Sequence, residues 1–399
     1  MAGQQAELHR RRHARGRAGF YDPKVRGIVM QAMLVLALLA LGYVLVSNAI
    51  ANLQRQNIAS GFDFLGRTAG FDISQTLIPY ANTMSYGRAF WVGLANTLLV
   101  AGLGIVLATC IGFTVGIARL SSNFVVSRLA GVYVELFRNI PPLLLLFAIY
   151  FGVLKTLPNP RDSIALPLSS FLNVRGLVVP RPIWLDGAGL VAIAFFAAVL
   201  LVIALRAWAA QRHRETGRTF PVGTTAVVLL IAFPALAFLA AGRPVAFDVP
   251  VAGRFNISGG MTLLPELVAL VAGLSLYTAA FIAEIVRAGI VGVDKGQKEA
   301  AAALGLTPAQ SMRLVVLPQA LRMMIPLLTN QFLNLTKNSS LAVAIGYPDL
   351  VSVFSGTVLN QTNQAIEVIA ITMAVYLVLS LITSLAMNLF NARMLLVER

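Results

Sequence analysis

The sequence predicts an all-α integral membrane protein with about 8 transmembrane helices, and three observations support this fold class. Hydrophobic residues make up 58% of the 399 residues and charged residues only 12%, whereas soluble domains carry roughly a quarter charged residues. Apolar runs of the length that crosses a bilayer, about 20 residues, recur along the chain. Basic residues stand in short clusters between these runs, which is how membrane proteins set their orientation. The net charge of +15 therefore indicates membrane topology and not nucleic-acid binding.

The first apolar run is interpreted as an N-terminal anchor. It is too long for a secretory signal peptide, and no cleavage pattern of small residues follows it. A basic tail, residues 1–27, precedes it as a topology signal beside anionic lipid or as a specific lipid or partner site. An outer loop, residues 51–87, follows it. The spans are expected at about 28–50, 89–118, 129–153, 187–206, 222–241, 263–289, 323–345 and 364–390.

The distribution of basic residues predicts the orientation. Placing the N-terminus in the cytoplasm puts 20 Lys and Arg residues on the inner side of the membrane and nine on the outer side. This excess predicts that both termini are cytoplasmic and that the number of spans is even. The same orientation places residues 290–322, which we call the elbow, in the cytoplasm.

Residues 88–391 are expected to form one membrane domain with a core and an insert. The core, residues 88–153 and 263–391, carries nearly all of the polar residues inside spans. The insert, residues 154–262, holds a proline-rich outer loop and two extra spans joined by a basic inner turn.

The elbow is predicted to contain two short helices separated by a glycine. Residues 298–304 are strong helix formers, and Gly305 ends that helix as glycine does at C′ positions. Thr307 and Gln310 then form a Thr-x-x-Gln capping box, with Pro308 at the first helical position.

The end of the elbow is marked by Leu317 and Pro318. Pro318 lacks an amide donor and is expected to bend the chain into the next span. The elbow is interpreted either as a generic hairpin or as a docking surface. The small, smooth surface of the alanines at 300–303 and the two helix caps favour docking.

The first polar cluster inside an expected span comprises Glu135, Arg138 and Asn139, just before Pro141 and Pro142. Two prolines break a helix, which a membrane tolerates where the backbone lines a cavity or packs on protein. The segment is interpreted either as a structural kink with a Glu135–Arg138 ion pair or as part of a pathway wall.

The second polar cluster surrounds Lys337, which stands fifteen residues beyond Arg322 at the inner surface. A rise of about 1.5 Å per residue puts Lys337 about 22 Å into a core of ~30 Å. An unpaired lysine there costs at least about 2.5–3.5 kcal/mol. Lys337 either reaches the outer surface or forms a structural pair, or, as we favour, meets a substrate carboxylate in a broken helix. Its polar neighbours are Asn330, Gln331, Asn334, Thr336, Asn338, Ser339 and Ser340.

The third polar cluster is Glu284 and Arg287, three residues apart at the inner end of the sixth span. They form either a surface pair of little energetic weight or a pair that positions the elbow. Catalytic motifs are absent from the sequence. No G-x-x-x-x-G-K-[S/T] phosphate loop occurs, and the three histidines and single cysteine make no metal set. We expect no enzyme activity, cofactor or metal in this chain.

The segment Glu299-Ala300-Ala301-x-x-x-Gly305, with Leu317-Pro318 beyond it, resembles the E-A-A loop of permease subunits from ATP-binding-cassette (ABC) importers. In that family the loop is the coupling element seated in a groove of the ATPase subunit. Four further segments are similar to the polar amino-acid branch of the family, which includes histidine, glutamate and general L-amino-acid systems. These are residues 137–143, 277–287, 295–297 and 337–341. The anchor, the insert and the length resemble the larger general L-amino-acid permeases of Gram-negative bacteria.

This resemblance implies a type I importer (MetI-like) permease core with an inserted helix pair, in a multi-pass protein of the bacterial inner membrane. It implies that this chain forms half of the translocation pathway of a binding-protein-dependent amino-acid importer. The alternative interpretation is a stand-alone secondary amino-acid transporter or channel. The implied partners are an ABC ATPase dimer that binds ATP and Mg, a second related permease subunit, a periplasmic amino-acid-binding protein and membrane lipid. The implied ATPase-coupling residues are Gly296, Glu299, Ala300, Ala301, Gly305, Leu317 and Pro318. The implied substrate-pathway residues are Glu135, Arg138, Asn139, Pro141, Tyr277, Asn334, Lys337, Asn338, Ser339 and Ser340.

One position departs from the pattern of this branch. The branch often has Lys-Asp-Ser-Ser where this chain has Lys337-Asn338-Ser339-Ser340. An Asp would supply a counter-charge to a cationic substrate, and Asn338 removes it. The departure favours broad or acidic and amide L-amino acids as substrates. The departure also leaves open that the partner permease holds the ligand. The sequence leaves open that this partner is a second copy of the same chain.

Overall fold

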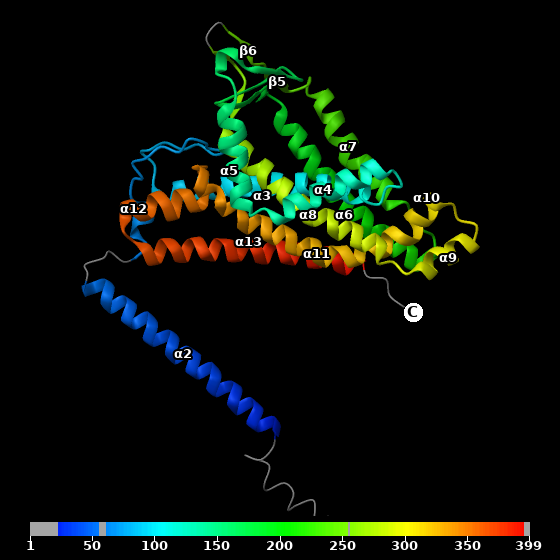
Figure 1. The fold of residues 1–399 in the computed structure, drawn as a ribbon, viewed down its shortest axis with the longest axis horizontal. Helices are drawn as coiled ribbons and strands as arrows, with labels where there is room; N and C mark the ends of the chain where they lie inside the picture. Colours follow the sequence, from blue (N-terminus) through cyan, green and yellow to red (C-terminus); the bar gives the residue numbers. More distant parts are fainter. Residues whose placement is uncertain (1–22, 56–60, 254–255, 395–399) are drawn as a thin grey trace, which may run out of the picture.

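The fold is taken from a computed structural model that describes residues 23–55, 61–253 and 256–394. Most of the predicted basic tail lies outside the described residues. The helix α2 (Pro23–Arg55) contains the predicted anchor. Figure 1 shows α2 apart from the rest of the protein, and none of its most apolar window is buried.

Helix α8 (Pro265–Val291) is the centre of a helical bundle, with 61% of its most apolar window buried. Helices α3 and α11 pack against α8, and α13 packs against α11 on the outside of the bundle (Figure 1). The elbow helices lie at one end of the bundle and α12 at the other, and we call these the elbow end and the far end. The bounds are α3 Tyr86–Ala118, α9 Lys295–Ala303, α10 Pro308–Ser311, α11 Leu317–Asn338, α12 Leu359–Thr362 and α13 Ala365–Met394.

Two glycines bring α3 into close contact with α8. A Cβ on Gly112 would lie 2.6 Å from Cβ of Ile282, and one on Gly116 would lie 2.7 Å from Cβ of Val286. Small residues four apart let two membrane helices approach this closely. The pair α3–α8 is therefore the most tightly packed part of the bundle toward the elbow end.

The predicted span 129–153 is broken, as its two prolines predict. Helix α4 (Phe124–Asn139) and the helical segment Pro142–Thr156 form a pair bent by 108°. The break falls at the expected pair of prolines, because Pro141 lacks an amide donor and Pro142 begins a new helix, α5 (Pro142–Phe147). The segment continues as a π-helix, Ala148–Val153, and a 3-10 turn, Leu154–Thr156. With this bent pair counted as one span, the described residues contain up to 8 candidate spans.

Pro318 does not bend the chain, contrary to the expectation from the sequence. Residues Pro308–Ile345 form one helical run of 38 residues. Pro318 is the second residue of α11 but lies inside this continuous run, so its missing amide donor falls within the helix. A π-helical turn, Met312–Val316, precedes it and widens the helix there. The elbow and the seventh span are thus one continuous rod.

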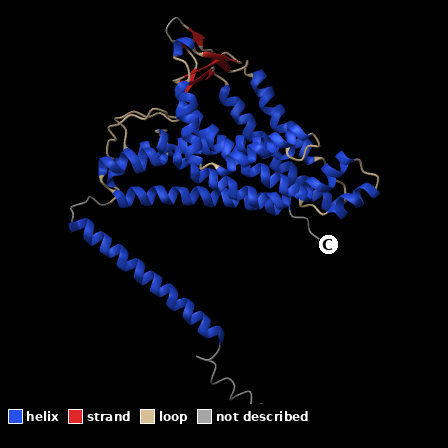
Figure 2. Ribbon diagram, in the orientation of Figure 1, coloured by secondary structure: helices blue, strands red, loops and turns tan. Residues whose placement is uncertain are grey.

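The insert contains short strands as well as the two expected helices, α6 (Ala188–Thr216) and α7 (Val222–Ala240). The strands gather at one place outside the bundle (Figure 2). Four of them form an antiparallel sheet in the order β1-β2-β3-β8, in which Leu177 pairs with Leu263, while β4 pairs with β5 and β6 with β7. Their bounds are β1 Ile164–Leu166, β2 Ser170–Asn173, β3 Gly176–Val179, β4 Arg181–Trp184, β5 Val245–Asp248, β6 Val251–Ala252, β7 Ile257–Ser258 and β8 Met261–Leu263.

The far end of the bundle is closed by a segment that folds back into it. The 3-10 turn Ser339–Ile345 is followed by a left-handed Gly346 (φ +76°) and a π-helix, Val351–Val358. Phe354 of this segment is fully buried in a second core cluster with Phe64 and Tyr86. This packing fixes the end of the helical run that begins in the elbow.

Candidate functional site

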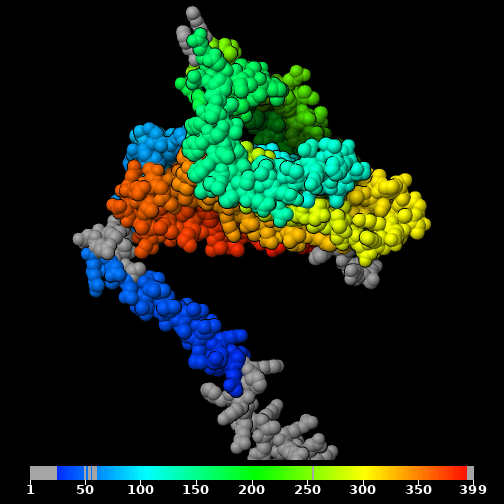
Figure 3. Space-filling view, viewed as in Figure 1, coloured from blue at the N-terminus to red at the C-terminus, as the bar shows by residue number. Residues whose placement is uncertain are grey.

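Two helices of the bundle carry polar residues on an exposed face. On α4 these are Arg128, Glu135 and Arg138, and on α11 they are Asn330, Asn334 and Lys337. Spacings of three, four and seven residues put each set on one side of its helix. Both helices pack against α8, and Figure 3 shows α4 at the molecular surface beside α8 and α11. A polar stripe on a membrane helix is costly against lipid. This face therefore requires water, substrate or another protein.

A cavity of about 280 Å³ lies halfway along α8, where α11 and the start of α5 face it. The predicted pathway residues Tyr277, Asn334 and Asn338 all line it. Arg138, also predicted, lies over the ring of Phe281, with 5.3 Å between its Cζ atom and the ring centroid. The full lining is Pro142, Tyr277, Thr278, Phe281, Gln331, Asn334 and Asn338. The cavity thus combines aromatic rings, three amide side chains and the hydroxyl groups of Tyr277 and Thr278, and it offers hydrogen bonds to a small polar molecule.

Several predicted pathway residues lie elsewhere. Lys337 is exposed and does not line the cavity. The Ser339 hydroxyl is buried and donates to the Thr336 carbonyl at 2.7 Å, and the Ser340 hydroxyl donates to the Lys337 carbonyl at 2.7 Å. Helix α11 continues through Lys337, so the break in the helix comes at residues 339–346 and not at the lysine.

The cluster before the double proline has a different geometry from the predicted ion pair. Within the described part of the chain, no ion pair joins Glu135 to Arg138. The Asn139 amide instead donates to the Glu135 carbonyl at 2.7 Å. Pro141 is the N-cap of α5 and sets the direction of the bent segment. The structure therefore has the kink of the first interpretation without its ion pair, and the second interpretation, a pathway wall, stays a prediction.

The elbow has the predicted helix–glycine–helix form. Asp294 caps α9 by accepting from the Gly296 amide at 2.6 Å, and Gly305 follows the helix with φ +76°. Thr307 and Gln310 form the reciprocal capping box. These local contacts hold the two short helices in a fixed relation to each other.

The surface of the elbow is open, with apolar side chains exposed. Leu304 is 81% exposed and Leu314 61% exposed. Of the predicted coupling residues, Ala301 is buried and the others are exposed: Gly296, Glu299, Ala300, Gly305, Leu317 and Pro318. A cavity of about 320 Å³ lies between the two short helices and the π-turn, lined in part by Lys298, Leu306 and Met312. Exposed leucines beside such a hollow are typical of a protein-docking surface.

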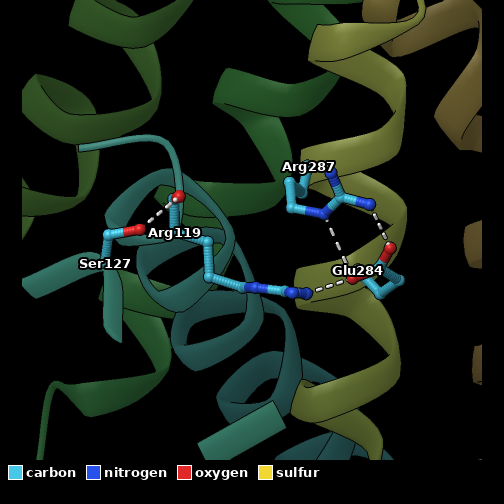
Figure 4. A network of polar contacts seen from close by, with 4 residues as sticks. All are labelled: Arg119, Ser127, Glu284 and Arg287. Atoms are coloured by element: carbon cyan, nitrogen blue, oxygen red, sulfur yellow. Dashed lines mark hydrogen bonds and ion pairs between the residues drawn. The ribbon is translucent and has the colours of Figure 1, made fainter. Parts of the chain in front are cut away.

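Glu284 joins three elements at the elbow end (Figure 4). It accepts from Arg287 through two hydrogen bonds, of 2.6 Å to Nη2 and 3.2 Å to Nε, and from Arg119, the C-cap residue of α3. The Ser127 hydroxyl of α4 donates to the Arg119 carbonyl at 3.0 Å. The predicted pair Glu284–Arg287 is therefore part of a network, and sequence reasoning missed Arg119. Nothing local could reveal it, because 165 residues separate Arg119 from Glu284.

A second network, at the far end, was also missed. Asp349 is fully buried and accepts from the Ser352 amide at 2.8 Å and the Tyr376 hydroxyl at 3.3 Å. Buried Asn96 of α3 donates to the Gln75 and Pro348 carbonyls at 2.9 and 2.8 Å. An Asp-x-x-Ser pattern just before a helix was the available signal for this cap. Among the described residues, no group of His, Cys, Asp and Glu side chains forms a metal site.

Residues 108–396 match the protein family of binding-protein-dependent transport system inner membrane components. The chain belongs to this family. The predicted fold class, an all-α membrane protein with a MetI-like importer permease core, is confirmed for this permease.

The permease is similar over nearly its whole length to curated relatives. It is 54% identical over 383 residues to the general L-amino acid transport system permease protein AapQ of Rhizobium johnstonii, covering 96% of each chain. It is 50% identical over 394 residues to the putative amino-acid ABC transporter permease protein YhdX of Escherichia coli, covering 98% of this chain and all of the relative. It is 40% identical over 410 residues to the glutamate/glutamine/aspartate/asparagine transport system permease protein BztB of Rhodobacter capsulatus, covering 95% and 96%. The predicted resemblance to ABC importer permeases of the polar amino-acid branch is confirmed.

Proposed function

We propose that this permease forms half of the translocation pathway of an ATP-driven, binding-protein-dependent importer of L-amino acids. The observation that carries the proposal is the exposed polar side of α4 and α11, together with the amide-lined cavity between α8 and α11 beside Tyr277. A second, related permease subunit would cover this face, so that water and substrate pass between the two chains. The elbow would seat in a separate ATPase dimer, which binds ATP and Mg.

The orientation assigned to the permease puts the elbow end in the cytoplasm. The excess of Lys and Arg in the sequence segments that this orientation assigns to the inner side, 20 against nine, supports it together with cytoplasmic N- and C-termini. The membrane is then the inner membrane of a bacterium, and the far end of the bundle faces the periplasm. A periplasmic amino-acid-binding protein would dock there.

The continuous helix from the elbow into the bundle supplies a mechanism for coupling. The run Pro308–Ile345 begins in the elbow and carries Gln331 and Asn334 of the cavity wall. A helix moves as a rod, so displacement of the elbow by closure of the ATPase shifts the cavity wall with it. Gln331 lies about 21 Å further along α11 than Leu317, the first residue of α11, at 1.5 Å per residue.

The substrates are proposed to be polar, acidic and amide L-amino acids. Three amide side chains line the cavity, which fits the carboxylate, ammonium and amide groups of such substrates. Asn338 lines it where an Asp would favour a cationic ligand. The names of AapQ and BztB, which refer to general L-amino acids and to glutamate, glutamine, aspartate and asparagine, agree with this range. Lys337, exposed next to Asn338, would meet the α-carboxylate at the interface with the second permease.

Affinity purification of the tagged permease from its native membrane tests the proposal. The importer predicts that an ATPase and a second permease co-purify, and that the reconstituted complex takes up L-glutamine only with ATP and a binding protein. A stand-alone secondary transporter is the alternative, and it predicts uptake by the purified chain alone, driven by an ion gradient. Uptake of that second kind would overturn the proposed function.

A further inference from the structure

A second cavity, of about 420 Å³, lies at the elbow end between the end of α3, the start of α4 and the last turn of α8. Its polar lining comes from Arg119, Ser127, Arg128, Glu135 and Arg287. Arg287 is nine or ten residues beyond Tyr277 and Thr278 on α8, which places this cavity about 15 Å nearer the elbow than the first one. Figure 4 shows that the side chains of Arg119 and Arg287 both reach the carboxylate of Glu284 there.

The charges of this cavity are only partly matched within the described residues. Glu284 engages Arg119 and Arg287, but Arg128 and Glu135 form no ion pair in that part of the chain. They stand seven residues apart on the same side of α4, about 10 Å along the helix axis. The cavity thus presents the guanidinium group of Arg128 and the carboxylate of Glu135. Their separation leaves room for a small molecule that contacts both groups.

We propose that this cavity is an inner station for an α-amino acid, an inference that rests on the proposed function. The α-carboxylate is held by Arg128, with Arg119 and Arg287 beside it, and the α-ammonium group by Glu135. Guanidinium groups bind carboxylates with directed, charge-assisted hydrogen bonds. A simple anion would meet the same arginines but would be repelled by Glu135, so the mixed charges select a molecule that carries both signs.

The balance of charge also selects among amino acids. Three arginines face two glutamates, Glu135 and Glu284, which leaves one net positive charge around the cavity. Neutral and acidic amino acids fit this balance, whereas arginine and lysine add a positive charge to it. The inner station therefore extends the preference proposed for the cavity beside Tyr277 toward the cytoplasmic end of the pathway.

The test measures binding of radiolabelled L-glutamate to the purified complex in phosphatidylcholine nanodiscs, without binding protein. Arg128→Gln and Glu135→Gln should each weaken binding to the inner station by on the order of tenfold. The matched control is Arg206→Gln, because Arg206 is exposed on α6 outside the cavity. Glutarate lacks the ammonium group of glutamate and should compete poorly with unmodified protein. In Glu135→Gln this preference for glutamate over glutarate should disappear.

Three results would overturn the inner station. Binding that is unchanged in both variants would do so, as would equal competition by glutarate or inorganic phosphate. Loss of binding when phosphatidylethanolamine replaces phosphatidylcholine would assign the cavity to a lipid headgroup.

Uptake by the same preparations separates this proposal from the proposed function on which it rests. Binding-protein-dependent uptake with no effect of either variant on binding contradicts only the inner station, whereas absence of uptake by the unmodified complex contradicts the proposed function.

Discussion

The polar-faced helices α4 and α11 contrast with α6 and α7 of the insert. From Ala188 to the residue before Arg206, α6 has no polar side chain, and its exposed surface is formed by large apolar residues such as Phe196 and Leu200. Hydropathy alone marks all of these segments as membrane helices. The distribution of polar residues around each helix separates those that suit lipid from those that need water or a partner.

The contrast indicates which helices of this fold can form the wall of a pathway. Figure 1 shows α6 and α7 reaching out from the bundle with the strands at their ends, while α4 and α11 lie against α8. The central helix is thus lined on one side by the polar faces and on another by α3, through Gly112 and Gly116. The wall of the pathway depends on that close packing.

The largest expected effect comes from disrupting the packing behind the wall. Gly116→Leu would force a side chain into Val286 and the Ala283 carbonyl, which lie 2.7 and 2.8 Å from the position of a Cβ atom. Overpacking of this kind costs about 3 kcal/mol. Thermal unfolding of the purified complex should show a midpoint lower by several degrees. Gly102→Leu in the same helix is the control, because nothing lies within 4 Å of its Cβ position, and equal midpoints for the two variants would contradict the packing.

The next effect tests the contrast between polar and apolar faces directly. Asn334→Leu removes an amide from the cavity beside Tyr277 and should lower uptake of L-glutamine by about tenfold without loss of assembled complex. The reverse change on the insert, Leu200→Asn, should leave uptake within about twofold, because Leu200 is 67% exposed on α6. Rates of uptake in proteoliposomes measure both. A larger loss from Leu200→Asn than from Asn334→Leu would invert the assignment of the two faces.

A smaller effect is expected from the network at Glu284. Glu284→Gln leaves Arg119 and Arg287 side by side without their shared carboxylate. Arg119→Gln removes only one of the two contacts, so Glu284→Gln should slow uptake by a few-fold and Arg119→Gln by less. The double variant should be less impaired than Glu284→Gln alone, because the repulsion between the arginines is gone. Strictly additive losses in this double-mutant cycle would show that the three residues do not act together.

The elbow was predictable because its structure is local. A glycine after a helix, and a capping box of Thr307, Pro308 and Gln310, are determined by neighbours in sequence, and both are present. The break at Pro141 and Pro142 was predicted for the same reason. Its angle of 108° was not, because packing of α5 against α8 sets the direction of the new helix.

Contacts between distant segments were beyond the reach of the sequence. Arg119 and Glu284, or Asn96 and Pro348, meet only because α3 packs beside α8 and the far-end segment folds back. The strands of the insert were missed because each has only two to four residues, too few to show an alternating pattern. Pro318 was misjudged because the π-helical turn Met312–Val316 directly before it lets the helix continue without its amide donor. For the polar cluster around Lys337, counting residues from Arg322 predicts a depth in the membrane, but it could not show that Asn334 and Asn338 line the cavity and the lysine does not.

The central claim is that an ATPase drives this pathway through the elbow, and a matched pair of glycines tests it most directly. Gly305 in the elbow and Gly217 after α6 both have positive φ, +76° and +68°, and nothing lies within 4 Å of the Cβ position of either. Gly305→Val and Gly217→Val therefore carry similar backbone strain. ATP hydrolysis and uptake of L-glutamine are measured together in proteoliposomes with the binding protein. We predict that Gly305→Val, like Glu299→Lys, assembles but loses uptake coupled to hydrolysis, while Gly217→Val keeps it. Normal coupled uptake by Gly305→Val, or equal loss in both glycine variants, would contradict the account.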